Sequence, residues 1–311
     1  MRHALPALLL LLTLPLQAEI KETGFIDFSY CGYHASEDSI PLAEVKAYVE
    51  CVEGDMSATI KQAIDYVSSL PIGRDGLRGA VLLGPGTFVL KERLAIEASG
   101  VVLRGSGRDI TVLRKEGFDR GSLLRIEGRQ DKTYGKDTLW VNEVVELGTK
   151  EISVAGPKGV GMGSLANRQV EIVRQSSAPW IEKVGCRIYG GGIDALAWKP
   201  GDIDLLWRRT VVGVDGNTLK LDAPLTMGFD PNEESSYIDN KKKLHEHVPM
   251  SPCYVRIVDD LGEIGESGIE NLTLESGFDP RNAHDENHCW TGVSLEYAHD
   301  CWPWHRISLG T

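Results

Sequence analysis

The stretch GAVLLGPGTFVLKERLAIEASGVVLRGSG, residues 79–107, decides the fold of this chain. Its apolar segments 81–83 and 101–103 begin 20 residues apart, and a third, 123–126, begins 22 residues further on. Several short strands per period of about 20–25 residues, with no helix between them, are typical of a solenoid. Because one turn of such a coil cannot bury its inner face alone, we expect the turns to stack into a parallel β-helix.

The same spacing returns near the end of the chain, in residues 269–274, 292–296 and 305–309. Residues 130–250 break it with alternating apolar and polar positions, and Asp215-Gly216-Asn217 is typical of a tight hairpin turn. We therefore predict a small β-rich subdomain inserted between two coils.

An amphipathic helix is predicted just before the first coil, with Asp55 at its start and Pro71 after its end. Its apolar positions keep a 3.6-residue period: Ile60, Ala63, Ile64, Val67 and Leu70. A helix in this place covers the open end of a solenoid core.

The first 18 residues are typical of an export signal. Arg2 and His3 precede an apolar run over 4–16, and Ala18 offers a small residue at the cleavage point. A membrane anchor is the alternative, but the run is short and contains two prolines. We expect a secreted or periplasmic protein that does not stay in the membrane.

These patterns predict an all-β chain in five parts: a signal peptide (1–18), an N-terminal segment with a capping helix (19–78), first β-helix coils (79–129), the inserted β-rich subdomain (130–250) and continuing coils (251–311). The sequence stops at Thr311 inside a coil and without a terminal cap, so we expect a longer native chain.

The net charge of −12 argues against non-specific nucleic-acid binding, which depends on neutralised phosphates. It leaves acidic substrates open, because a local cluster of arginines can reverse the field within one groove. Export permits disulfides among the six cysteines. Cys31 with Cys51 and Cys289 with Cys301 are the candidate pairs, and free thiols are the alternative.

Residues 56–107 and 268–275, together with the region from Asp300 to 307, resemble the pectate-lyase-like superfamily of right-handed parallel β-helix proteins. The Gly-Pro-Gly-Thr turn at 84–87 and the Arg-Gly-Ser-Gly turn at 104–107 carry this resemblance. It implies a right-handed β-helix. The superfamily includes polysaccharide lyases, rhamnogalacturonase-like and other glycoside hydrolases, epimerases and phage tailspikes, so the resemblance leaves the reaction open.

Histidines, tryptophans and carboxylates concentrate between residues 284 and 306. Convergent polar and aromatic groups of this kind suit a sugar-binding subsite, although the same residues can be structural. For catalysis we select His288, His299, Tyr297, Asp285 and Arg306. For substrate binding we select Asn287, Trp290, Glu296, Trp302 and Arg187. Asn271 and Glu275 are expected one coil upstream of Glu296 and His299.

Two reactions fit these residue types. A lyase needs a base to remove the proton next to the uronate carboxyl, and also a group that neutralises that carboxylate: Asn287, an arginine, or Ca²⁺ held by Asp285, Glu286 and Asp300. A hydrolase needs two carboxylates flanking the glycosidic oxygen, with the same three acids as candidates.

We therefore expect an exported protein acting on an acidic polysaccharide, with β-elimination favoured and glycoside hydrolysis as the alternative. A carbohydrate-binding or adhesion protein without turnover is a second hypothesis. A phage-type tailspike is a third, which the export signal disfavours.

Overall fold

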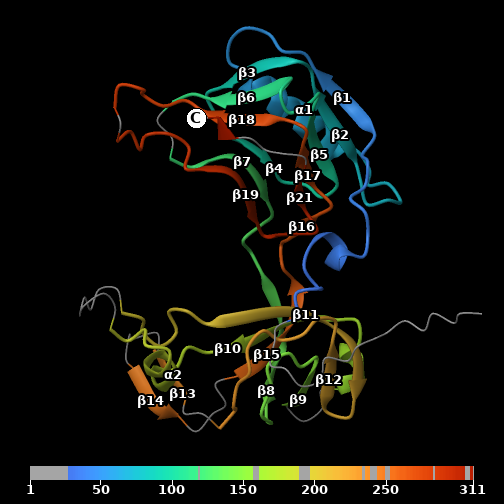
Figure 1. Cartoon of the computed structure of the whole chain (residues 1–311). Coiled ribbons are helices and arrows are strands. Elements are labelled where there is room, and N and C mark those ends of the chain that lie inside the picture. Colours follow the sequence, from blue (N-terminus) through green and yellow to red (C-terminus); the bar gives the residue numbers. More distant parts are fainter. Residues whose placement is uncertain are drawn as a thin grey trace, which may run out of the picture.

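A computed structural model describes residues 27–117, 120–156, 161–188, 197–232, 235–238, 244–248, 253–282, 284–304 and 309–310. The predicted signal peptide lies outside these residues. The chain forms a stack of parallel coils and an antiparallel barrel, joined by the strands that leave and re-enter the stack (Figure 1). Neither helix of this described part is long and apolar enough to cross a membrane.

Three parallel sheets form the walls of the coil stack. The first sheet contains β1 (Val45–Val49), β2 (Gly79–Leu83), β5 (Val101–Gly105), β17 (Gly268–Glu270) and β21 (Trp302–Trp304). The second contains β3 (Gly86–Leu90), β6 (Thr111–Lys115), β18 (Thr273–Ser276) and β22 (Leu309–Gly310). The third contains β4 (Leu94–Ile96), β7 (Ser122–Glu127) and β19 (Thr291–Glu296).

The register of the first sheet matches the predicted repeat. Gly79 pairs with Val101, and Val102 with Gly268, which in turn pairs with Trp302. Side chains such as Val81, Leu103 and Ile269 are fully buried between the three sheets. The β-helix-like stack expected from the sequence is therefore present.

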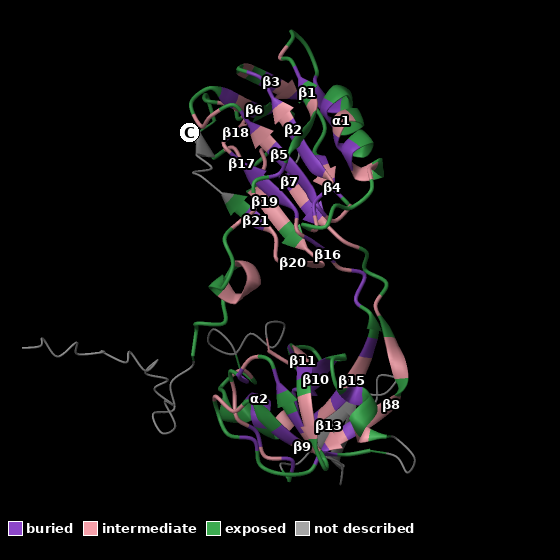
Figure 2. Cartoon of the chain, turned by 90° about the vertical axis from the view of Figure 1, so that its right-hand side faces the viewer, coloured by how far each residue is buried: buried purple, intermediate pink, exposed green. Residues whose placement is uncertain are grey.

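The predicted helix is α1 (Ser57–Ser69), and it closes the N-terminal end of the core. Ile60, Ile64 and Val67 are buried in the same cluster as the coil residues, and exposed residues cover the helix's outer side (Figure 2). Met56, not Asp55, occupies the N-cap position. The Asp55 carboxylate lies one residue earlier and accepts hydrogen bonds from the backbone and hydroxyl of Ser57.

The inserted β-rich part is a closed six-stranded antiparallel barrel in the order β10-β11-β12-β9-β8-β15. Its strands are β8 (Thr133–Val141), β9 (Glu151–Ala155), β10 (Gln169–Arg174), β11 (Leu205–Asp215), β12 (Thr218–Leu221) and β15 (Cys253–Asp260). Short elements accompany it: η2 (Met162–Leu165), α2 (Ala178–Lys183), and the hairpin of β13 (Ser235–Ile238) with β14 (Leu244–Val248). The predicted turn at Gly216 joins β11 to β12.

The barrel extends beyond the boundary expected at residue 250, because β15 pairs with β8 and β10 and not with a coil. Without this strand the sheet would have two open edges, and pairing of β15 with both of its neighbours closes the barrel. Its core is separate from that of the coils and includes Leu139, Ile172 and Val255. The chain leaves the coil at Gly128 and returns at Gly262, where the Arg129 N–H donates to the Gly262 carbonyl at 2.7 Å.

Candidate active site

A stacked turn at the edge of the first sheet brings two carboxylates together. β16 (Ile264–Gly265) pairs in parallel with β20 (Ala298–His299), and β17 pairs with β21 after it. Glu266 and Asp300 therefore hold the same position in successive coils. Both have left-handed backbones, with φ of 56° and 47°. Such a conformation costs of order 1–3 kcal/mol for a non-glycine residue and is frequent at functional sites.

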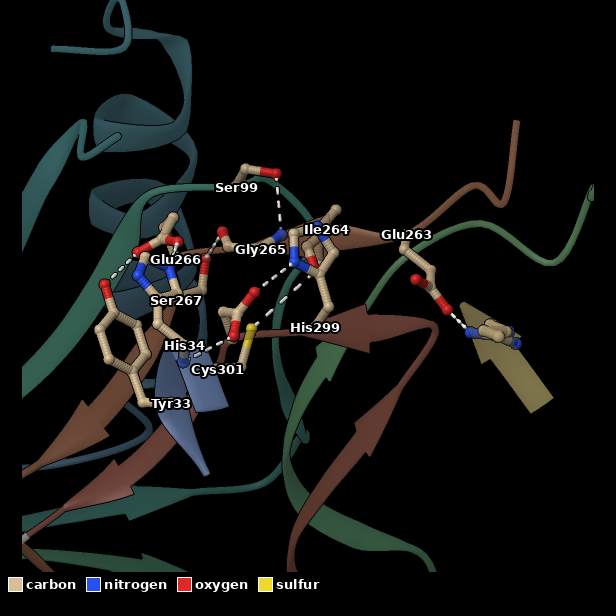
Figure 3. Close-up of polar contacts among 12 residues, drawn as sticks. Tyr33, His34, Ser99, Glu263, Ile264, Gly265, Glu266, Ser267, His299 and Cys301 are labelled. Carbon is tan, nitrogen blue, oxygen red and sulfur yellow. Dashed lines mark hydrogen bonds and ion pairs between the residues drawn. The ribbon is translucent and has the colours of Figure 1, made fainter. Parts of the chain in front are cut away.

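The N-terminal segment supplies a tyrosine and a histidine to this turn, from η1 (Tyr33–Ser36). The Tyr33 hydroxyl donates to Glu266 Oε2 at 2.5 Å, and His34 Nε2 lies 2.6 Å from Glu266 Oε1. His34 Nδ1 lies 2.8 Å from an Asp38 oxygen, and the His34 backbone N–H donates to Asp300 at 2.9 Å. Figure 3 shows Tyr33 and His34 pointing toward Glu266.

These contacts hold two protons in the cluster. Because both ring nitrogens of His34 face carboxylates, the hydrogen bonds to Asp38 and Glu266 raise the pKa of the imidazole. Burial, together with the hydrogen bond to Glu266, raises the pKa of the Tyr33 hydroxyl. Near neutral pH, His34 is therefore stabilised as an imidazolium and Tyr33 as a neutral phenol.

His299 forms a dyad with Asp300 on the other side of the turn. The two side chains meet at 3.0 Å through His299 Nδ1 and Asp300 Oδ2. Burial raises the pKa of Asp300, but the hydrogen bonds from His299 and the His34 backbone outweigh it and keep the pKa below its usual value. The ionised carboxylate orients the imidazole, and Nε2 makes no hydrogen bond within the described residues. His299 is half exposed.

A cleft of about 640 Å³ lies beside this cluster, between the N-terminal segment and the first sheet. Tyr33 and Asp38 line it together with Ile40, Glu270 and Asn271. Its volume falls within the range of ligand pockets, and its lining combines apolar with polar groups. The tyrosine of the cluster thus also faces a space that a sugar ring fits.

The three acids expected to bind calcium do not lie together in the structure. Asp285 Oδ1 and Oδ2 already accept backbone N–H groups of Asn287 and Asp279, which lower the pKa of this carboxyl. Glu286 lies 3.9 Å from Arg120. Neither acid joins Asp300, whose metal-ligating neighbours in the described chain are on the stacked turn and the N-terminal segment.

The donor atoms of His34, Glu266 and Asp300 do converge, within 4.8 Å of one another. One nitrogen and two carboxylate oxygens suit Zn²⁺ or Mn²⁺ better than Ca²⁺, which takes six to eight oxygen ligands. His34 would have to lose the proton that faces Glu266 before it could ligate a metal ion.

Half of the other predicted residues lie in the loop between β18 and β19. The Trp290 indole donates to the Glu286 carbonyl and stacks under the Arg120 guanidinium at 5.3 Å. Asn287 accepts from Arg120, and His288 Nδ1 lies 3.0 Å from the Cys289 carbonyl. This loop lines a second cleft, of about 550 Å³, through Asp285 and Asn287. The stacked turn is not part of its lining.

The structure corrects one further expectation. Trp302 is only 3% exposed and lies edge-on to Tyr33, so its ring faces are not open to a sugar. Arg187, selected for substrate binding, lies beside α2 of the barrel, 3.4 Å from Glu182. Arg306 lies outside the described residues.

The expected stacking of Asn271 and Glu275 beside Glu296 and His299 is also wrong. Glu275 pairs with Arg114 and Gly310, Glu296 pairs with Glu127, and His299 pairs with Gly265. Residues stack on the equivalent strand of the next coil, and the long loop after β18 changes the residue offset between coils.

The thiols of Cys31, Cys51 and Cys301 are free, so neither candidate disulfide is formed. Burial raises the pKa of the Cys301 thiol to about 11.

Sequence analysis missed Tyr33, His34 and Glu266. A signal for Glu266 was available: when the strand starts of the first sheet are aligned, Gly100, Glu266 and Asp300 fall at one position. Gly100 has the same left-handed backbone, with φ of 79°. Two acidic residues at a position that favours glycine mark the site.

No family model and no curated protein matches this chain. Among solved structures, distant matches include three phage tailspikes. Gp54 of Acinetobacter baumannii bacteriophage AP22, in complex with A. baumannii capsular saccharide, has 11% identity and a TM-score of 0.41 over 79% of this chain. Gp61 of Pseudomonas phage phi297 has 12% identity and 0.39 over 79%. Gp49 of Pseudomonas phage LKA1 has 15% identity and 0.33 over 70%.

The chain spans 29%, 31% and 29% of the length of these three tailspikes. TM-scores below 0.5 do not assign a function.

Proposed function

We propose that this chain is a carbohydrate-active enzyme that cleaves an acidic polysaccharide by β-elimination at the stacked turn. The observation that carries this proposal is the His299–Asp300 dyad beside the Tyr33–Glu266–His34 network. A base and a proton donor thus lie on the two sides of one turn. We further propose that the enzyme acts in the periplasm or outside the cell, on the basis of the export signal.

His299 is the base in this scheme. In the neutral imidazole, Asp300 favours the proton on Nδ1, so Nε2 is the nitrogen that accepts a proton. Nε2 removes the proton from the carbon next to the uronate carboxyl. The electrons of this C–H bond form the C=C bond, and the glycosidic C–O bond breaks.

His34 is the proton donor to the leaving oxygen in this scheme. The two carboxylates beside its ring favour the imidazolium, and one ring N–H must leave its carboxylate to face the leaving oxygen. Glu266 accepts hydrogen bonds from both His34 and Tyr33 and so positions the donor.

Glycoside hydrolysis is a second candidate, favoured by the presence of two carboxylates, Glu266 and Asp300, in one cluster. Their ligand atoms lie within 4.8 Å of one another, and glycosidases use a pair of carboxyl groups. In this scheme Asp300, with its lowered pKa, is the nucleophile, and Glu266 must first receive the proton that it shares with His34 before it acts as the acid.

The test uses the purified chain on a panel of uronate and neutral polysaccharides. The ultraviolet absorbance of unsaturated uronates and the release of reducing ends are followed together. We expect both to rise, and His299→Asn to lower the rate by about 10²–10⁴-fold. The control is His284→Asn, an exposed histidine of the loop after β18. Reducing ends alone would indicate hydrolysis, and neither signal would favour a binding protein.

A further inference from the structure

We infer that Lys132, Arg208 and Arg256 of the barrel form a subsite that binds the carboxylate of a uronate. This inference rests on the proposed function and assigns the residues that bind the carboxylate of its substrate. The need for such a subsite follows from charge, because Asp38, Glu266 and Asp300 outnumber the His34 imidazolium at the stacked turn. An anionic sugar must therefore find positive charge elsewhere.

The three cations gather around one buried carboxylate on the barrel wall. Glu171 of β10 is fully buried and contacts Arg256 through Oε1. Its Oε2 lies 3.8 Å from Lys132 Nζ and 3.7 Å from Arg208 Nε. The Tyr134 hydroxyl donates to Oε1 at 3.0 Å.

This cluster carries one positive charge more than its carboxylates balance. Arg208 also pairs with Glu263, so three cations face two carboxylates, +3 against −2. Of the neighbouring ions, Arg168 pairs with Asp259, and Arg129 pairs with both Asp260 and Asp131, so two cations there face three carboxylates, +2 against −3.

Lys132 is the residue of the cluster best placed to bind an added carboxylate. Its ammonium makes no hydrogen bond within the described residues, and its nearest carboxylate oxygen is 3.8 Å away. The Arg256 Nε atom is buried and likewise lacks a hydrogen-bond partner in the described chain. The side chains of Lys132, Arg208 and Arg256 are 22%, 39% and 31% exposed, so a ligand can reach all three.

The cluster contacts the chain two residues before the proposed base, at Tyr297. Lys132 Nζ is 6.0 Å from the centre of the Tyr297 ring, and Tyr297 precedes the strand that carries His299. Glu263, the partner of Arg208, precedes β16 at the matching position. Figure 3 shows the polar residues continuing from Tyr33 through Glu266 and His299 to Glu263.

This placement fits the chemistry of β-elimination. The proton on the carbon next to the uronate carboxyl becomes acidic enough for removal only when that carboxylate is neutralised. Arginine and lysine neutralise a carboxylate through charge-assisted hydrogen bonds. The barrel side would thus supply the carboxylate-binding groups and the coil turn the base.

The experiment measures binding without turnover. In the His299→Asn background, affinities for tetragalacturonate, an alginate tetrasaccharide and a hyaluronan tetrasaccharide are determined by calorimetry, with cellotetraose as the neutral probe. Lys132→Gln should weaken binding of the best uronate about tenfold or more and reduce its salt dependence, whereas Lys132→Arg should restore it. Arg256 is left in place because its removal would strand buried Glu171.

Lys150→Gln is the matched control, because this lysine also sits over a tyrosine ring, 4.7 Å from Tyr30, but outside the cluster. Equal affinity in Lys132→Gln and the control would overturn the inference, as would equal binding of cellotetraose. Unsaturated products from the wild type together with unchanged Lys132→Gln affinity would overturn the subsite alone. A Lys132-dependent affinity without any turnover would overturn the lyase proposal and keep the subsite.

Discussion

A methyl group at Gly265 should disable the proposed base while leaving the fold intact. The His299 ring lies directly over Gly265, the residue with which it pairs in the parallel bridge. A Cβ added there would press on His299 Cε1 and lie 2.8 Å from Nε2, closer than Cβ atoms approach other atoms. In Gly265→Ala the imidazole must therefore rotate away, which breaks its contact with Asp300.

The effect of Gly265→Ala on stability differs in size from its effect on activity. The lost charge-assisted hydrogen bond is worth about 1.5–3 kcal/mol at most, and the half-exposed His299 places it at the low end. Replacing glycine recovers about 0.4–1 kcal/mol through the unfolded chain. The free energy of unfolding should thus fall by only about 1 kcal/mol, whereas activity should fall by about 10²–10⁴-fold.

The assay combines urea unfolding with the rate of unsaturated-uronate release, for Gly265→Ala, His299→Ala and the double variant. Gly163→Ala, where an added Cβ meets nothing within 4 Å, is the control. In the double variant the methyl group has no ring to displace, so only the gain of about 0.4–1 kcal/mol from the unfolded chain should remain. Full activity in Gly265→Ala would refute the assignment of His299 as the base.

Three further predictions concern pH, a buried ion pair and metal. The pKa of His34 is raised above its ordinary 6.5, so its ion pairs stabilise the N-terminal segment fully below about pH 6.5. This stabilisation is lost as the pH rises through the raised pKa. Hydrogen exchange of residues 33–38 should therefore accelerate in that pH range. Arg104 and Glu270 are 11% and 7% exposed, so Arg104→Met should cost about 3–5 kcal/mol in urea unfolding, and Arg104→Met with Glu270→Met should recover most of it. Since both oxygens of Asp285 are occupied by backbone N–H groups, a calcium chelator should leave activity unchanged; a loss restored by Ca²⁺ alone would contradict this.

The coil stack and its capping helix could be predicted because burial imposes a period on the sequence. Phe88, Leu103 and Ile126 face one core, and a polar residue at any of these places would be costly. The barrel could be predicted because it interrupts that period. Its last strand could not be assigned to the barrel, because the apolar residues of β15 also suit a coil strand.

The site was harder to predict, because no period connects its parts. Tyr33 and His34 come from a segment without repeated apolar positions, more than 230 residues from Glu266 in sequence. Which acids stack depends on loop lengths between strands, so Asp300 was found but assigned to the wrong partners. Trp302 was misinterpreted because sequence alone does not reveal that Tyr33 covers it.

The return of the chain to Gly262, beside its exit at Gly128, has a consequence for how this protein folds. A solenoid ordinarily grows one coil at a time, but here Arg104 and Glu270 of adjacent coils are 166 residues apart. Closing that loop in a flexible chain costs about 2 kcal/mol more than closing a 20-residue coil. A barrel with its own core removes most of this cost when it folds first, because its two ends then emerge side by side. The folded insertion would thus hold the following coils close to the preceding ones. Variants that destabilise the barrel should therefore slow the assembly of β17 onto β5.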